Sequence, residues 1–288
     1  MAKTEFEEFI QNSIENSKGV SYPVDASLLE RLLVLKVSCD KLHPNPEDEF
    51  CFPDIGPHYG IISNYVSRFA DNLKKGLPLM EEPLYIQKIR PRGYMLLNGH
   101  HRWAAAMRLG IKRVPVRIIN TTKESDIRNV LESSDHDRRV TIDLDEVLFR
   151  KEDDPVVEKK PGILSFGIQK KPLRQGAPAL LSALRRKGFD IWVYSADFYS
   201  VDDIKKYFRR YKVGVDGVIT GMKKKRKDGG SMLSQAEQLF SGKYNTTLHI
   251  DNDMMLVTHS GSSDFEEIDL NCAPENWSRE AINAVEQL

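Results

Sequence analysis

The chain has 288 residues, of which 40% are hydrophobic and 29% charged, and its formal net charge is zero. The length favours two domains of ordinary size, and the composition supplies enough apolar residues for their cores. Basic and acidic residues are balanced in both halves, so composition gives no support to nucleic-acid binding and leaves room only for a local basic groove.

The N-terminal segment and the cysteines indicate the compartment. No stretch approaches the roughly 18 apolar residues of a membrane span, and the polar, acidic first residues are unlike a secretory signal. The three cysteines, Cys39, Cys51 and Cys272, have no CxxC spacing. This pattern favours a reducing compartment over a disulfide framework or a structural zinc site. We therefore expect a cytoplasmic protein with no membrane partner.

The first half of the chain predicts a mixture of helices and strands. Apolar residues at helical spacing, alternating residues and glycine or proline breaks define the elements. A proline-bearing segment, 42–53, cannot form a regular helix. The predicted elements are helices at 5–16, 59–75 and 102–109, and strands at 33–37, 84–89, 94–97 and 114–119.

The second half predicts a parallel sheet. Residues 121–139 are polar and charged, and 133–137 is the best linker candidate. Beyond it, short apolar strands at 140–144, 191–194 and 247–250 are separated by helical segments, which is typical of α/β folds. The domain boundary is therefore expected near residue 137, giving domains 1–137 and 138–288.

The strongest motif is the end of the strand at 140–144, where Asp143 and Asp145 follow in the sequence IDLDEVL. Residues two positions apart in a strand point to the same side. Two carboxylates at the C-terminal end of a parallel strand suit Mg²⁺ and in-line phosphoryl transfer, with one as nucleophile and the other as general acid and base.

Three further features follow in chain order. The strand IWVYS ends in the hydroxyl of Ser195, which is suited to hold a phosphoryl oxygen. A lysine cluster at 223–227 precedes a helix-like segment, 231–240, and supplies cations to offset phosphate charge. Finally, the strand LHIDND ends in Asp251 and Asp253, which are suited to complete a metal shell.

Together these four motifs resemble those of the haloacid dehalogenase superfamily of phosphotransferases, over residues 138–288. The resemblance implies that Asp143 forms an aspartyl-phosphate, that Asp145 is the acid and base, and that Ser195 binds phosphate. It further implies an Mg²⁺ site at the motif carboxylates, with Asp251 and the backbone carbonyl of Leu144 as ligands. The resemblance also implies a Rossmann-like parallel sheet.

Some positions within these motifs stay open. The motif lysine is Lys223, Lys224, Lys225 or Lys227, and we prefer Lys227 because it directly precedes the predicted helix. Asp251 ranks before Asp253 as a metal ligand because it follows the strand at once. Residues 150–175 are too short for a large inserted cap domain. An open site of this kind would admit a bulky substrate such as a macromolecular end.

The second motif lies in the first half, where a predicted strand leads into Asn98-Gly99-His100-His101-Arg102 and an alanine-rich helix. The first N–H groups of a helix, together with imidazole and guanidinium, form an anion site, so phosphate is the expected ligand. Adjacent histidines on a helix do not face each other, which makes a zinc site the weaker interpretation. The alternative without a ligand is a helix cap.

This turn, together with the sequence LHPNP at 42–46, resembles the ParB/sulfiredoxin fold over residues 33–120. Members of that fold bind nucleotides through the turn. His100 stands where sulfiredoxins carry their catalytic cysteine, so sulfinate reduction is excluded. A partition protein would continue into a basic helix-turn-helix, which this chain does not. The turn is instead similar to the Asp-Gly-His-His-Arg of free-serine kinases, from which it departs at Asn98.

Those kinases use a carboxylate of the first box as general base. The resemblance therefore points to Glu47, with Asp48 and Glu49 as neighbours in an open register. ATP or ADP is the implied nucleotide, and CTP is a further option because other members of the fold bind it.

The sequence thus predicts a bifunctional phosphotransfer protein, with an Mg²⁺-dependent phosphatase joined to a nucleotide-binding domain that is a candidate kinase. Nucleic-acid ends rank slightly ahead of a small phosphorylated metabolite as substrate, because of the open site and the basic run KKKRK. The alternative is a nucleotide-sensing or DNA-associated binding module, whose second domain is the only catalyst or an inert platform.

Overall fold

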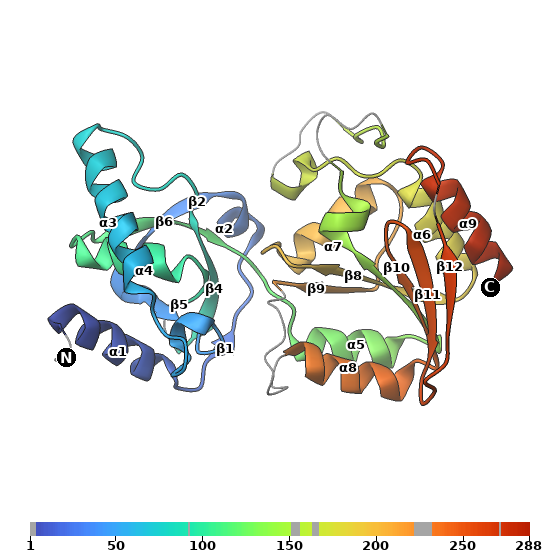
Figure 1. Cartoon of the computed structure of the whole chain (residues 1–288), viewed down its shortest axis with the longest axis horizontal. Helices are drawn as coiled ribbons and strands as arrows, with labels where there is room; N and C mark the ends of the chain where they lie inside the picture. The colour runs from blue at the N-terminus through green and yellow to red at the C-terminus, as the bar shows by residue number, and fades with distance from the viewer. Residues whose placement is uncertain (1–3, 92, 151–155, 163–166, 222–231, 271) are drawn as a thin grey trace. The chain divides into compact units, whose positions relative to one another are not determined.

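The computed structural model describes residues 4–91, 93–150, 156–162, 167–221, 232–270 and 272–288. It divides into two compact units, Met1–Asn120 and Thr121–Leu288, hereafter unit 1 and unit 2. Each unit holds a mixed β-sheet with helices packed on it, which confirms the mixed α/β class (Figure 1). Among the described residues, no helix combines the length and apolarity that a membrane crossing needs.

Unit 1 contains four helices and six strands in its described part. The sheet has the order β2-β6-β4-β5-β3, and β1 pairs with β4. The elements confirm the predicted pattern and add three short ones, β1, α2 and β3. In chain order they are α1 (Glu5–Ser17), β1 (Tyr22–Pro23), α2 (Leu28–Leu32), β2 (Val34–Ser38), β3 (Leu42–Pro44), α3 (Tyr59–Lys74), β4 (Leu84–Arg90), β5 (Tyr94–Asn98), α4 (His100–Arg108) and β6 (Arg113–Ile118).

The core of unit 1 fixes the start of α4. Trp103 and the three alanines after it are buried, so the helix presents one apolar face to the sheet and to α3. Ile62 and Phe69 of α3 pack in the same cluster. Burial of these large side chains, at roughly 1.5–3 kcal/mol each, holds the helix start against the end of β5.

Unit 2 has a second sheet of the order β12-β11-β10-β7-β8-β9. Strands β10, β7, β8 and β9 are parallel, and β11 and β12 extend the sheet antiparallel. The elements in chain order are α5 (Glu124–Ser133), β7 (Arg138–Asp143), α6 (Ala177–Arg186), β8 (Phe189–Ser195), α7 (Val201–Arg210), β9 (Gly217–Thr220), α8 (Met232–Lys243), β10 (Thr246–Ile250), β11 (Met254–His259), β12 (Phe265–Asp269) and α9 (Trp277–Gln287).

Helices cover both faces of this sheet, as Figure 1 shows, with α5 and α8 side by side on one face and α6, α7 and α9 on the other. The alternation of β8 follows from this layering. Ile191 and Val193 pack in the larger cluster, whereas Trp192 packs with Phe240 of α8 on the opposite face. A strand buried on both faces reads as a continuous apolar run, as predicted for a parallel sheet.

The domain boundary expected near residue 137 is wrong, because the units divide after Asn120. The polar segment that suggested a linker contains α5, whose Ile127 packs with Trp192. Just before that helix, the Thr122 hydroxyl donates to the Val218 carbonyl of β9 at 2.8 Å. The apolar stripe of α5 is too narrow to stand out among its charged neighbours.

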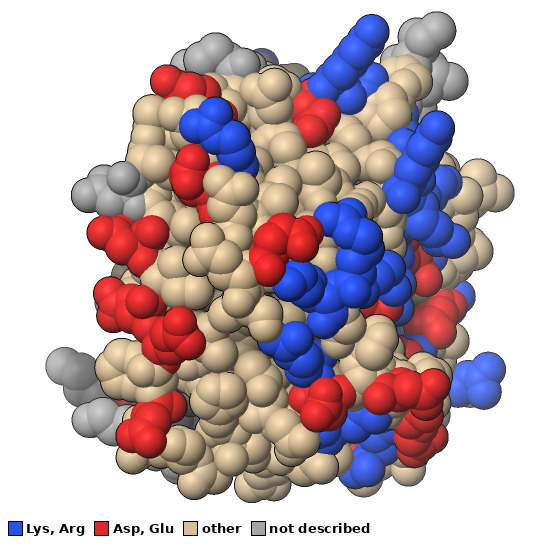
Figure 2. All heavy atoms as spheres, turned by 90° about the vertical axis from the view of Figure 1, so that its right-hand side faces the viewer, with Lys and Arg blue, Asp and Glu red and all other residues tan. Residues whose placement is uncertain are grey.

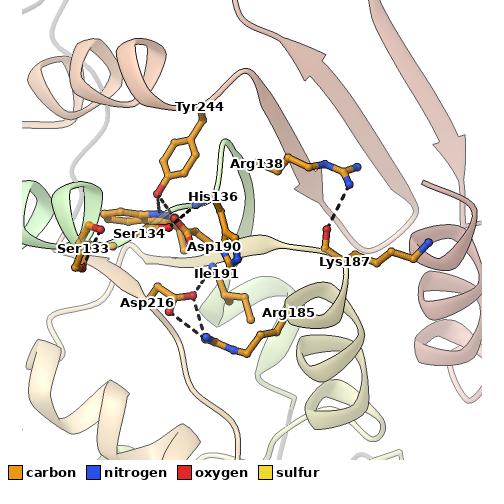
Figure 3. Close-up of polar contacts among 12 residues, drawn as sticks. Ser133, Ser134, His136, Arg138, Arg185, Lys187, Asp190, Ile191, Asp216 and Tyr244 are labelled. Atoms are coloured by element: carbon orange, nitrogen blue, oxygen red, sulfur yellow. Dashed lines mark hydrogen bonds and ion pairs between the residues drawn. The ribbon is translucent and has the colours of Figure 1, made fainter.

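The expected linker 133–137 is also fixed within unit 2 (Figure 3). Nδ1 of His136 lies 2.9 Å from Oδ1 of Asp190, a buried residue of β8. The Tyr244 hydroxyl donates to the other oxygen of Asp190 at 2.8 Å. The Asn245 amide donates to the Asp137 carbonyl at 2.7 Å. These bonds tie the segment to the amino ends of β7, β8 and β10.

Candidate functional site

The topology of unit 2 places a site at the C-terminal ends of β7 and β10. The chain runs from β7 outward to β8 and β9, then returns to the other side of β7 as β10. Ligands of open parallel sheets bind at such a switch point, beyond the carboxyl ends of the strands. Asp143 ends β7, and Asp251 follows β10 directly, so the sequence-predicted carboxylates come from the two strands that flank this point.

Asp143 is held by the turn that it begins. Its Oδ1 accepts the amide of Asp145 at 2.8 Å and that of Glu146 at 2.7 Å. The residues after it, Leu144–Leu148, form a π-helical turn, a distortion that is frequent at functional sites. Burial raises the pKa of the Asp143 carboxyl, and the charges of Glu146 and Asp251 add to this rise.

Asp145 faces Ser195 at the end of β8. The Ser195 hydroxyl, fully buried, donates to Oδ2 of Asp145 at 2.6 Å. The Asp197 amide donates to the same hydroxyl oxygen at 3.1 Å. Burial raises the pKa of Asp145, although the Ser195 hydrogen bond opposes the shift. Oδ1 of Asp145 is buried and has no hydrogen-bond partner among the residues that the structure describes, a costly state for a carboxylate oxygen.

The loop after β10 carries the other two predicted carboxylates. Asp251 lies close enough to Asp143 to raise its pKa, and it accepts the amide of Asn252 at 2.7 Å. Asp253 begins the return to β11, and its carbonyl accepts the Leu270 amide at 2.7 Å. Its side chain is exposed, and the hydrogen bonds and ion pairs found among the described residues do not join it to the other carboxylates. The structure therefore groups Asp143, Asp145, Asp251 and Ser195, and leaves Asp253 at the edge.

The metal prediction is only partly consistent with this geometry. Within the described ranges, no group of three or more His, Cys, Asp or Glu side chains is placed to hold a metal. The Leu144 carbonyl, predicted as a ligand, accepts the Phe149 amide at 2.8 Å inside the turn. A carbonyl oxygen has a second lone pair, so its role as a ligand stays a prediction. Mg²⁺ itself needs one or two carboxylates, with water and substrate phosphate as further ligands. Two of these carboxylates, such as Asp143 and Asp251, fit that smaller requirement.

Two other expectations concern neighbouring segments. The preferred motif lysine, Lys227, lies outside the described residues, as do Lys223, Lys224 and Lys225. In the described part of 150–175 the structure has a 3-10 turn, Gly167–Lys170, and two isolated β-bridges.

In unit 1, Gly99 makes the predicted turn possible. Its φ of 97° is in the left-handed region, and it caps α4. A Cβ at this position would lie 2.6 Å from Cδ2 of Leu84. The Gly99 carbonyl accepts the Trp103 amide at 2.8 Å. A helix leaves its first N–H groups without intrahelical partners, so those of His100, His101 and Arg102 are the groups that the predicted anion site would use.

The predicted role of the His100 side chain in phosphate binding is wrong. The ring is 3% exposed, its Nε2 accepts the Asn45 amide at 3.1 Å, and its Nδ1 faces Oδ2 of Asp48 at 3.5 Å. Burial lowers the pKa of His100 to about 3, so the ring is neutral near pH 7. His100 therefore joins α4 to the first box, with both nitrogens occupied by protein groups.

His101 and Arg102 lie nearer the surface, and protein groups hold both. Nε2 of His101 accepts the His58 amide at 3.2 Å. The Arg102 guanidinium donates to the Glu82 carbonyl at 2.7 Å and to Oδ1 of Asn98 at 3.4 Å. Arg102 thus folds back over Gly99, and the neutral Asn98 serves it as a hydrogen-bond acceptor without the charge of an aspartate.

The first box separates its three carboxylates. Asp48 is buried, and its Oδ1 accepts the Phe50 amide at 3.0 Å, whereas Glu47 and Glu49 are exposed. Sequence reasoning missed the contact between Asp48 and His100. The cap that Asp48 forms on the Phe50 amide is local and could be expected from the sequence, but it says nothing of the contact with His100. Glu47 keeps the accessibility that a general base needs.

Comparisons with known proteins support part of this interpretation. Residues 74–134 match the ParB N-terminal domain, which includes the α4 turn and agrees with the predicted resemblance of that region. No curated protein matches the chain.

Several solved structures give weak overall matches. A free serine kinase in complex with ADP shows 12% identity and a TM-score of 0.23, covering 88% of this chain and 82% of that one. A conserved hypothetical protein from Pyrococcus furiosus shows 13% identity and a TM-score of 0.24, covering 86% of this chain and 98% of that one. A free serine kinase in complex with AMP shows 14% identity and a TM-score of 0.25, covering 86% of this chain and 95% of that one. TM-scores this low establish neither a shared fold nor a shared activity.

Proposed function

We propose that unit 2 hydrolyses phosphate monoesters through an aspartyl-phosphate on Asp143. The carrying observation is the contact of Asp145 with Ser195 beside Asp143, at the switch point of a parallel sheet. The four motifs that resemble haloacid dehalogenases support the same chemistry. The match to the ParB N-terminal domain ends at residue 134, so the proposal rests on the geometry and on that resemblance.

The geometry divides the work between the two carboxylates. Two amides hold Oδ1 of Asp143, which leaves Oδ2 to attack phosphorus. As the Oδ2–P bond forms, the P–O bond to the leaving group breaks, and Asp145 gives its proton to the leaving oxygen. Asp145 then takes a proton from water, which attacks phosphorus and releases phosphate and Asp143. A raised pKa suits Asp145 to this exchange.

A bound Mg²⁺ would offset the charge of the phosphoryl group. Asp143, Asp145 and Asp251 are the residues proposed to hold it, with Asp253 as a peripheral partner. Ser195 is buried at the site and would turn its hydroxyl from Asp145 to a phosphoryl oxygen.

The test is hydrolysis of an aryl phosphate with Mg²⁺. Asp143→Asn keeps the shape and removes the nucleophilic charge, so the rate should fall by several orders of magnitude. Asp264→Asn, at an exposed position before β12, is the matched control and should hydrolyse at the parental rate. Near-parental activity of Asp143→Asn would show that another group is the nucleophile.

The charges at the site bear on the class of substrate. Glu146 and Asp251 are exposed beside it, and carboxylates repel a polyanion. Figure 2 shows a face where Lys and Arg side chains gather between groups of Asp and Glu. At the end of α6, Arg186 pairs with Glu286 at 2.9 Å. Because carboxylates lie exposed beside the site, we propose that the substrate is a phosphate monoester of low total charge. Nucleic-acid ends therefore rank below small metabolites.

We further propose that unit 1 binds a nucleotide at the start of α4 and transfers its phosphate, with Glu47 as the base. The match to the ParB N-terminal domain and the left-handed Gly99 before α4 support this site. Calorimetry of the full chain with ATP, ADP, CTP and GTP tests it. Arg102→Ala should weaken binding about tenfold to a hundredfold, whereas Arg108→Ala on the same helix should not.

Turnover separates the kinase from a nucleotide sensor. Glu47→Gln should keep the affinity and stop phosphate transfer. If the parental protein binds nucleotide without turnover, unit 1 is a binding module and the kinase proposal is wrong. If no nucleotide binds at millimolar concentration, the turn is a helix cap.

A further inference from the structure

Arg174 is a buried arginine beside the candidate site of unit 2. Its residue surface is 5% exposed, and the guanidinium carbon lies 4.1 Å from the centroid of the Trp277 ring in α9. Its backbone amide donates to the Leu148 carbonyl at 2.8 Å, at the end of the turn that follows Asp143. Burying a guanidinium costs free energy unless polar groups compensate its charge. The polar contacts of Arg174 therefore indicate what this residue does.

One of those contacts reaches the loop after β10. The Arg174 guanidinium donates to Oδ1 of Asn252. The side-chain nitrogen of Asn252 donates in turn to the Glu146 carbonyl at 3.2 Å. Asn252 therefore stands between a buried cation and the turn that presents the nucleophile. This bridge consists of Arg174, Asn252 and Glu146.

The bridge offsets a repulsion in the same place. Asp143 and Asp251 follow Ile142 and Ile250, which are partners in the parallel pairing of β7 with β10, so the two carboxylates lie at neighbouring strand ends. Like charges push the loop away from the turn. The backbone amide of Asn252 also donates to Oδ1 of Asp251 at 2.7 Å. By holding Asn252 in place, Arg174 therefore also holds the Asp251 carboxylate.

We propose that Arg174 is a positioning residue, which holds the loop 251–253 against the turn after β7 through Asn252. It thereby keeps Asp251 beside Asp143, two of the carboxylates that are proposed to hold the divalent cation. The cation part of this inference rests on the proposed function of unit 2. The positioning of the loop does not depend on that function.

Two variants of the full chain separate charge from packing. Arg174→Met keeps the length and the apolar contact with Trp277 but removes the donors and the charge. Arg174→Lys keeps the charge without the planar fork. Arg185→Ala is the matched control, because that arginine pairs with Asp216 at the amino ends of the strands.

Hydrogen exchange of the metal-free protein gives the first readout. In Arg174→Met, the amides of Asp251 and Asn252 should exchange about tenfold faster or more, while those of β10 and α9 stay protected. Arg174→Lys should lie between this variant and the parent. Unchanged loop exchange would overturn the proposal, and so would faster exchange throughout unit 2, because Arg174 would then act only in general packing.

Mg²⁺ binding, measured by calorimetry, gives the second readout. Arg174→Met should weaken the affinity about tenfold, and Arg185→Ala should leave it unchanged. Adding Asn252→Ala to Arg174→Met should cause little further loss, because both act through one bridge. Unchanged Mg²⁺ affinity in Arg174→Met would overturn the cation part. Faster loop exchange in a chain that binds no Mg²⁺ would support the positioning and overturn the metal-dependent phosphatase.

Discussion

The two ends of the parallel sheet in unit 2 use carboxylates in opposite ways. At the amino ends (Figure 3), Asp190 accepts from Tyr244 and faces His136, and Asp216 pairs with Arg185. At the carboxyl ends, Asp145 has a buried oxygen for which the described part of the chain offers no hydrogen-bond partner.

The difference separates carboxylates that stabilise the fold of this unit from carboxylates that do not. Paired carboxylates stabilise a fold, whereas buried carboxylates that face one another reduce its stability and are retained where chemistry needs them. Substitutions at the amino ends should therefore change the free energy of unfolding and spare activity. Substitutions at the carboxyl ends should do the reverse.

The largest expected effect is on catalysis at the carboxyl ends. Asp145→Asn removes the proton carrier, so hydrolysis of an aryl phosphate should slow by about 10²–10⁴-fold, and the aspartyl-phosphate should accumulate. Urea unfolding should give a free energy equal to or above the parental value, because a buried, partly unpartnered charge is lost. A clear loss of stability without loss of activity would reverse the comparison.

The pH dependence of the same variant sharpens this point. Burial raises the pKa of Asp145 above its ordinary value, so the folded state binds its proton more tightly than the unfolded state does. The stability from this group is present below the ordinary pKa and is lost as pH rises through the raised one. As pH rises through this range, the unfolding free energy of Asp145→Asn should therefore decrease less than that of the parent.

At the amino ends, Asp190→Ala should cost about 3 kcal/mol of unfolding free energy. The change leaves the buried Tyr244 hydroxyl without its acceptor, and His136 loses its partner. Activity per folded molecule should match the parent, measured at a temperature well below unfolding. Tyr244→Phe, which removes only the hydroxyl, should cost less. A catalytic defect in Asp190→Ala would show that the two ends are not separable.

Unit 1 contains a buried group whose pH dependence has the opposite sign to that of Asp145. Burial lowers the pKa of His100 from 6.5 to about 3, so the unfolded chain binds this proton first. Its contribution to stability is complete above about 6.5 and is lost as pH falls toward 3. One pKa unit corresponds to about 1.4 kcal/mol, so the loss amounts to a few kcal/mol at most.

Hydrogen exchange read separately for each unit of the full chain tests this. The amides of α4 and β6 should lose protection as pH falls through that window, after correction for intrinsic exchange rates. In His100→Gln the acid-dependent loss should shrink. An equal loss in both proteins would assign the acid sensitivity to another group.

These sites show which features a sequence can predict. Asp143 and Ser195 end apolar strands, Asp251 follows one directly, and parallel order brings such ends together. Asp145 lies in the π-helical turn after β7, so its motif was visible in the sequence but its local structure was not. The turn at Gly99 is equally local. In contrast, Asp48 meets His100, and Arg174 meets Asn252, across long stretches of chain. No spacing rule encodes such contacts, because packing of the whole unit creates them.

The same distinction explains the misplaced boundary. The segment with α5 has the charged surface of a linker, and its apolar residues, such as Ile127, find their partners only on β8 and α8. The β11–β12 hairpin was missed for a similar reason. Its outer strand, β12, is mostly exposed, so it lacks the apolar alternation that identifies a strand.

The smallest expected effect is that of Arg185→Ala at the amino ends. Both oxygens of Asp216 lie 3.0 Å from the Arg185 guanidinium, yet the two side chains are 46% and 25% exposed. Such pairs contribute about 0–1 kcal/mol, and salt screens them further. Asp216 also accepts the Ile191 amide at 2.8 Å, so Asp216→Ala should cost more than Arg185→Ala. Urea unfolding at low and high salt checks both variants, and a larger cost for Arg185→Ala would mean that the exposed pair, rather than the backbone contact, secures the start of β8.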